Sequence, residues 1–246
     1  MTATGTCAGR GRLSRPDHAR VFRWQRDTDE KENKMNETPI DYPKSRKFSA
    51  PLGSVRYGRL RFLSGASNVT VHTDPSTADL YRARFEGPLP SVRVEGGAVA
   101  IEYPWTLHPF DWRKKGADVE LNGSIPWEIG FDGGLSRFDA DLSGLRLDSF
   151  SARGGVSRVE LLLAEPSGKV SIRFDGGAND VTVSRPKGVA TCVLVGGGAS
   201  KLALDDQHFG AIGGETKLES PDYAEAADRY EITITGGASS VAIGIR

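Results

Sequence analysis

Short runs of alternating apolar and polar residues flank a repeated glycine pair in this chain. In the segment ITITGGASSVAI, Ile232 and Ile234 precede the pair, and Val241 and Ile243 follow it. A period of two is typical of a β-strand with one buried face. The runs are rich in Val, Ile, Phe and Thr, which strands favour. The pattern therefore predicts strand, corner, strand, whereas only residues 222–229 resemble a helical turn.

The same unit recurs along the chain. The pairs at 133, 154, 176 and 197 are separated by about 21 residues, and Ser64-Gly65 is a degenerate further copy. The residue after each pair is Ala, Leu or Val, and Ser or Asn comes next in every copy except the one at 96–97. Repetition at a fixed period indicates a repeat architecture. The predicted structural corners are Gly96, Gly97, Gly133, Gly134, Gly154, Gly155, Gly176, Gly177, Gly197, Gly198, Gly236 and Gly237.

Two all-β architectures fit such a repeat, a meander of hairpins and a β-solenoid. Turns of the Pro-x-Gly type at 166–168 and 186–188 separate the corners in both. In a solenoid, equivalent residues of stacked coils lie about 4.8 Å apart, so each column must pack on copies of itself. One corner glycine would adopt positive φ and its partner would let neighbouring backbones approach. The aligned columns favour a single-domain β-solenoid, β-helix-like, of about seven strand–GlyGly-corner–strand repeats.

The repeats resemble a known family. The segments FDGGLSRFDADLSGLRL, ARGGVSRVELLL, FDGGANDVTV, VGGGASKLAL and ITGGASSVAIG are similar to the toast-rack or putative-adhesin repeat domains of bacterial envelope-associated and stress-associated proteins. The similarity is good over 125–246, weaker over 50–104 and absent over 1–45. The resemblance implies a β-solenoid without established catalytic machinery. Members often sit beside membrane segments or DNA-binding modules, and neither is recognised in this sequence.

The domain organisation follows from where the repeats begin. Residues 1–45 are predicted to be a disordered N-terminal tail, with Met35 as an alternative translation start. Residues 46–246 are predicted to form the solenoid, with insertions at 103–124 and 205–229. The first 34 residues carry eight Lys or Arg and five Asp or Glu. An alternative interpretation is therefore a basic tether for an anionic surface or an acidic partner.

Composition narrows the function classes. The chain has 32 basic and 32 acidic residues in 246, so its formal net charge of zero argues against nucleic acid as the main partner. Its two cysteines, Cys7 and Cys192, do not indicate a disulfide framework. No apolar run reaches the roughly 18 residues of a membrane span, and no secretory signal is recognised. The default expectation is a cytoplasmic protein, with envelope association as the alternative.

The insertions carry the candidate binding residues. Aromatic side chains beside cations could stack on sugars or grip an anionic partner, or they could form a flap over an open edge of the core. Phe209, Ile212, Tyr223 and Tyr230 of the second insertion are expected to close the C-terminal end of the stack. The candidate binding residues of the first insertion are Tyr103, Trp105, Phe110, Trp112, Arg113, Lys114 and Lys115.

Catalytic and metal sites find little support in the sequence. No phosphate-binding loop occurs, and His18, His72, His108 and His208 lack metal-ligand spacing. The expectation is a non-enzymatic scaffold without cofactor or metal that binds a protein, a surface polymer or copies of itself, with a link to envelope stress. The alternative is a carbohydrate-active enzyme that uses carboxylates on one face. Its candidate residues are Asp139 and Asp141 on one strand, and Asp132 and Asp175 beside glycine pairs.

Overall fold

The computed structural model describes residues 46–104 and 116–246. The chain divides into two compact units, Met1–Asp41 and Tyr42–Arg246, and every described residue belongs to the second. The predicted tail, 1–45, and its alternative start at Met35 lie outside the described residues. In the part that is described there is no helix, so none that could cross a membrane.

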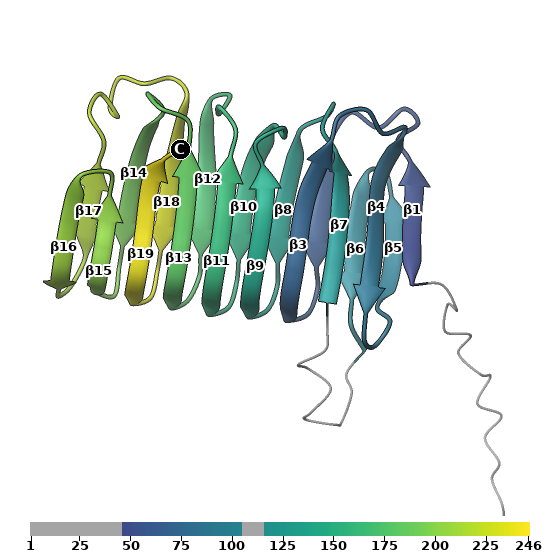
Figure 1. Ribbon diagram of the computed structural model, residues 1–246, viewed down its shortest axis with the longest axis horizontal. Coiled ribbons are helices and arrows are strands. Elements are labelled where there is room, and N and C mark those ends of the chain that lie inside the picture. The colour runs from purple at the N-terminus through teal and green to yellow at the C-terminus, as the bar shows by residue number, and fades with distance from the viewer. Residues whose placement is uncertain (1–45, 105–115) are drawn as a thin grey trace, which may run out of the picture. The chain divides into compact units, whose positions relative to one another are not determined.

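Strands of the second unit form two sheets that face each other across one core (Figure 1). The first sheet has the order β1-β4-β7-β3-β9-β11-β13-β19-β15-β16, and the second has the order β17-β14-β18-β12-β10-β8-β2-β6-β5. The strands are β1 (Lys47–Pro51), β2 (Gly58–Phe62), β3 (Ala66–Asp74), β4 (Asp79–Glu86), β5 (Ser91–Glu95), β6 (Ala98–Glu102), β7 (Gly116–Asn122), β8 (Trp127–Phe131), β9 (Leu135–Leu142), β10 (Leu147–Ala152), β11 (Val156–Leu163), β12 (Lys169–Phe174), β13 (Ala178–Arg185), β14 (Ala190–Val195), β15 (Ala199–Leu204), β16 (Gln207–Ile212), β17 (Thr216–Glu219), β18 (Arg229–Ile234) and β19 (Ala238–Ile245).

The middle of this unit is a solenoid. Each coil is a strand of the second sheet, a glycine corner and a strand of the first sheet. Neighbouring coils pair in parallel and in register, so that Ser136 faces both Ser67 and Ser157. These ladders confirm the predicted columns and exclude a meander here. The coils with such corners are β2–β3, β8–β9, β10–β11, β12–β13, β14–β15 and β18–β19.

The coils do not stack in chain order. The last coil, β18–β19, lies between β12–β13 and β14–β15, and the first coil, β2–β3, lies beside β7 and β6 as well as β8–β9. Ala238 accordingly pairs with Ala178 on one side and Ala199 on the other. Because every coil presents the same columns, any coil can serve as a neighbour of any other. The repeat therefore specifies the coil but not its place in the stack.

Antiparallel strands complete the two ends. β1, β4 and β7 pair antiparallel in the first sheet, and β5 pairs antiparallel with β6 in the second. β16 and β17, from the predicted second insertion, pair antiparallel with β15 and β14. The pair Gly96-Gly97 is thus a hairpin turn within one sheet, and its prediction as a solenoid corner was wrong. Both glycines have positive φ, +55° and +89°, as a tight hairpin requires.

Glycine at the solenoid corners lets the backbones of neighbouring coils approach each other closely. A Cβ on Gly154 would lie 2.6 Å from the backbone N of Gly134, and one on Gly236 would lie 2.7 Å from the backbone of Gly176. One corner glycine, Gly198, has the expected positive φ, +80°. In every corner a positive φ also falls three residues after the glycine pair, on a residue that the parallel ladders leave unpaired in both strands without a change of register. The residues in this left-handed column are Asn68, Arg137, Arg158, Asp180, Lys201 and Ser240, with φ between 53° and 58°.

The apolar columns fill the space between the sheets. Phe62 stacks on Phe131 with ring centroids 4.8 Å apart, and Phe150 contacts Phe138 and Phe174 at 5.6 and 5.8 Å. All five rings are essentially inaccessible to solvent. Since one continuous core runs beneath both sheets, the outer faces and the sheet edges remain as the surfaces that can bind other molecules.

Candidate binding groove

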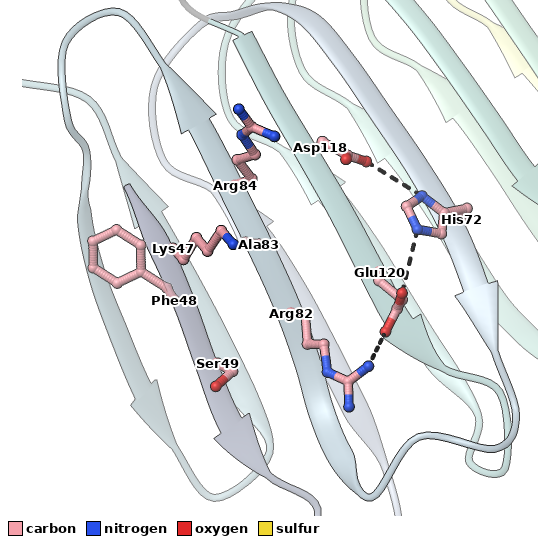
Figure 2. A pocket seen from close by; sticks show the side chains of 9 residues that line it. All are labelled: Lys47, Phe48, Ser49, His72, Arg82, Ala83, Arg84, Asp118 and Glu120. Carbon is pink, nitrogen blue, oxygen red and sulfur yellow. Dashed lines mark hydrogen bonds and ion pairs between the residues drawn. The ribbon is translucent and has the colours of Figure 1, made fainter. Parts of the chain in front are cut away.

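A hollow of about 340 Å³ crosses four strands on the outer face of the first sheet (Figure 2). β1, β4, β7 and β3 lie side by side there, and alternate residues of each strand point outward. Two further hollows, of about 270 and 510 Å³, share Arg84 with it. We call this surface the Arg84 groove. The hollow of about 340 Å³ is lined by Lys47, Phe48, Ser49, His72, Arg82, Ala83, Arg84, Asp118 and Glu120.

One wall of the groove is a chain of alternating acidic and basic side chains. His72 lies with Nδ1 3.3 Å from Asp118 and Nε2 3.5 Å from Glu120. Glu120 also accepts a hydrogen bond of 3.1 Å from Arg82, which donates a second one, of 2.8 Å, to Asp79. The hydrogen bond to Asp79 raises the pKa of Arg82. The register of β3, β4 and β7 sets this order, because His72 and Arg82 both face Glu120.

Arg84 occupies the centre of the groove and differs from these neighbours. It is exposed and lines all three hollows. Within residues 46–104 and 116–246, its guanidinium has neither an ion pair nor a hydrogen bond. Asp118, opposite Arg84 in the strand register, is instead close to His72. The donors of Arg84 therefore remain available for a carboxylate or another planar anion.

Tyr103 is the one predicted binding residue that the structure describes. It is buried, its ring lies edge-on to Phe85 at 6.3 Å, and its hydroxyl donates to the carbonyl of Gly116 over 3.4 Å. Burial raises the pKa of the phenol. Its side chain thus belongs to the core rather than to an exposed binding surface. The other six residues, Trp105, Phe110, Trp112, Arg113, Lys114 and Lys115, lie outside the described residues.

The candidate catalytic carboxylates have structural partners instead. Asp141 accepts hydrogen bonds from the backbone N and the hydroxyl of Ser143, at 3.0 and 2.6 Å, and these bonds lower its pKa. A general acid needs the opposite shift. Asp132 pairs with Arg61 and Arg153, and Asp175 pairs with Arg173. For Asp139, on the same strand as Asp141, no partner that would complete an acid–base pair is evident.

The described histidines and cysteine do not form a metal site. Residues 46–104 and 116–246 contain no cluster of His, Cys, Asp and Glu arranged to hold a metal ion. His72 belongs to the groove and His208 lies on β16, whereas His18 and His108 lie outside the described residues. Cys192 is buried, and burial raises the pKa of its thiol. Its packing matches that of a small apolar residue.

Sequence reasoning missed two features. The groove brings together outward residues of strands that are distant in the sequence, so no local motif could reveal it. A second feature did carry a signal, Asx-x-Ser, which recurs where β3, β7 and β9 end. The side-chain oxygens of Asp74, Asn122 and Asp141 accept the backbone N–H two residues later at 2.8, 2.9 and 3.0 Å. These Asx turns lie at the ends of three neighbouring strands of the first sheet.

The parallel ladders, paired glycines and two facing sheets define an all-β repeat protein of the solenoid class. Residues 90–184 match the sequence model of the N-terminal domain of toast_rack. This match confirms, over these residues, the predicted resemblance to the toast-rack family.

Solved structures extend the comparison. A protein from Clostridium sporogenes, described as a putative cell adhesion protein, is 19% identical with a TM-score of 0.58, over 81% of this chain and 97% of its own. A putative adhesin from Bacteroides fragilis is 9% identical with a TM-score of 0.30, over 83% of this chain and 99% of its own, which is too distant to support an argument. The first likeness shows a shared fold. No curated protein matches the chain.

Proposed function

We propose that this protein is a non-enzymatic binding module of the putative-adhesin type, and that the Arg84 groove receives an anionic group of a surface polymer or protein. The observation that carries the proposal is the exposed Arg84, which faces three hollows without a partner in the described part of the chain. The toast-rack match and the fold shared with a protein described as a putative cell adhesion protein support a binding role.

The groove is suited to a ligand with one anionic group and several hydroxyl or amide groups. Arg84 would donate to the anion in a planar, two-bond arrangement. The carboxylates of Asp118 and Glu120 and the hydroxyl of Ser49 lie nearby to accept or donate further hydrogen bonds. Because all these side chains lie on paired strands, little ordering of the backbone would accompany binding.

The test uses two carboxylate polymers, polygalacturonate and poly-glutamate, with neutral dextran as the negative probe. Titration calorimetry should detect binding of at least one carboxylate polymer and none of dextran. Arg84→Glu should weaken binding by about tenfold or more, since it replaces attraction with repulsion. Arg146→Glu is the matched control, because Arg146 is exposed, lies outside the groove and makes the same charge change. Equal losses in both variants, or no binding of either polymer, would contradict the proposal.

The cellular setting that we propose is an association with the cell envelope. The default expectation of a cytoplasmic protein gains no support from the comparisons, whereas the Clostridium sporogenes structure is described as a putative cell adhesion protein. A link to envelope stress and self-association belong to the same proposal. Fractionation of native cells tests the location, and recovery of the protein entirely in the soluble cytosolic fraction would count against it.

A further inference from the structure

The two sheets expose four edge strands, and one of them differs from the rest. β1 carries Lys47 and ends at Pro51, β5 carries Arg93 and Glu95, and β17 carries Lys217 and Glu219. Charges and prolines on edge strands discourage pairing with other chains, except where opposite charges come to lie across from each other. β16, with the sequence QHFGAI, has no Asp, Glu, Lys, Arg or Pro, and its first five residues are exposed. It is thus the unprotected edge among the described strands.

The core is also incompletely covered at this end. Phe209 faces the buried Leu202 across the β15–β16 ladder, so its ring lies on the inner side of the sheet, yet 37% of it is exposed. Across the core, Leu218 of β17 faces the buried Val193. The amide of Gln207 donates to the carbonyl of Glu219 over 3.1 Å and links the ends of β16 and β17. The terminal strands of both sheets therefore form one common end (Figure 1).

We infer that a second copy of this chain docks on this end, with β16 pairing antiparallel to β16 of the partner. A two-fold axis perpendicular to the sheets, through Phe209, would place each Phe209 against its copy and extend the core across the junction. The same axis would bring β17 beside its copy. This inference rests on the self-association in the proposed function and names its surface and symmetry.

The charges of β17 fit this symmetry. In the sequence TKLE, an antiparallel pairing centred on Leu218 places Lys217 opposite Glu219 of the partner strand, twice. Within one chain the two side chains already lie 2.7 Å apart, so the two internal ion pairs of two chains can be replaced by two intermolecular ones. On β16, His208 would lie opposite Gly210 of its partner, where no side chain competes for space. A second copy related by this one two-fold axis would thus pair with both β16 and β17.

Sedimentation equilibrium over a concentration series tests the inference directly. The wild-type protein should form a dimer and no larger species, because a two-fold interface closes on itself. Gly210→Lys should raise the dimer dissociation constant by about 100-fold, through like-charge repulsion and steric interference at the junction. A Cβ at Gly210 meets no atom within 4 Å, so the variant should fold. Ser91→Lys adds the same charge to the exposed β5 edge at the other end and should leave the dimer unchanged.

A charge exchange on β17 examines the symmetry. Lys217→Glu should weaken the dimer, because it places two carboxylates opposite each other. Adding Glu219→Lys should restore it, since the intermolecular pairs are reformed with reversed sign. Thermal unfolding of each variant at low concentration shows whether the monomer itself is affected. A purely local role of the ion pair would change the monomer melting temperature and leave the dimer constant unaltered.

Three results would overturn the inference. They are a wild-type chain that stays monomeric at millimolar concentration, a dimer that tolerates Gly210→Lys, and polymers that grow steadily and vanish in Ser91→Lys. The last would indicate head-to-tail association through both ends. Arg84→Glu should still dimerise, and Gly210→Lys should still bind the carboxylate polymer. The two variants therefore separate a failure at this edge from a failure of the groove.

Discussion

The middle coils and the two ends of the second unit differ in how their strands pair. In the middle, parallel strands pair like with like, and identical columns of Ser, Val, Ile and Phe run from coil to coil. At the ends, antiparallel strands β1, β4, β5, β16 and β17 have no repeat pattern. A middle coil has a neighbouring coil on both sides. An end strand has one free edge, which must either be protected from pairing or serve to pair with another chain.

Because of this difference, we expect the middle coils to provide stability and the two ends to provide recognition. The column of buried phenylalanine rings from Phe62 to Phe174 lies in coils that have a neighbour on each side, so a change there affects the coils on both sides. The groove and the uncharged strand β16 lie at opposite ends of the sheet order, where outward and edge residues are not part of the repeated columns. The ends are thus where we place binding, and the repeats are the rigid support.

The largest effect should come from deleting β18–β19, residues 229–246. In a solenoid stacked in chain order this deletion would only shorten the end, but here it removes a coil from between β12–β13 and β14–β15. We expect β14 to β17 to lose their hydrogen-exchange protection while β8 to β11 retain theirs. Protection of β14 and β15 at the full-length level would show that the coils do not depend on this order.

Removing an aromatic ring should lower the free energy of unfolding more in the middle coils than at the end of the stack. Phe150→Ala leaves a cavity among Phe131, Phe138 and Phe174 and should lower the free energy of unfolding by about 3–5 kcal/mol. Phe209→Ala, at a partly exposed site, should cost about 1 kcal/mol or less in the monomer. Urea denaturation at low concentration measures both, and equal costs would remove the distinction between the regions.

Corner glycines offer a finer test of the same distinction. Gly154→Ala should destabilise by about 1–3 kcal/mol, because its Cβ would lie 2.6 Å from the Gly134 backbone. Gly155→Ala is the matched control, since its Cβ has ordinary contact at 3.7 Å. At the hairpin, Gly96 needs positive φ but has open space, so Gly96→Asn should be tolerated where Gly154→Asn is not. Chemical denaturation ranks all four, and a stable Gly154→Asn would argue against tight corners.

The smallest effect concerns the Asx turns and is measured as a change in how stability depends on pH in acid. Hydrogen bonds from Ser76 and Ser143 lower the pKa of Asp74 and Asp141 in the folded chain. Their contribution is complete above the unfolded pKa of about 3.9 and is lost as the pH falls through the lower folded values. Asp74→Asn with Asp141→Asn should therefore make the melting temperature less sensitive to pH below about 4. An unchanged acid dependence would show that other carboxylates dominate.

Several features of the fold could be predicted because they are local. The alternation around Ile232, Ile234, Val241 and Ile243 fixes strands and their inner faces, and the repeated Gly-Gly-Ala-Ser fixes a corner. The pair at 96–97 misled because a hairpin turn and a solenoid corner both favour glycine. Nothing near residue 97 shows whether the next strand enters the same sheet or the opposite one. That choice depends on which strands are available as neighbours.

The groove could not be predicted for a related reason. Arg84 and Asp118 face each other only because β4 and β7 pair antiparallel. Asp139 and Asp141 have the spacing of a same-face pair, which the sequence does show. The hydrogen bonds from Ser143 that lower the pKa of Asp141 are equally local, and the Asp-x-Ser motif could have revealed them.

By itself the sequence determined the unit of this protein, a two-strand coil with apolar inner columns and a glycine corner, since short-range alternation and turn chemistry act within about 20 residues. Only the tertiary structure decided the order in which the coils stack, the antiparallel ends, the groove and the free edge. Identical columns make the coils equivalent as neighbours, so their order depends on long-range packing that no single repeat encodes.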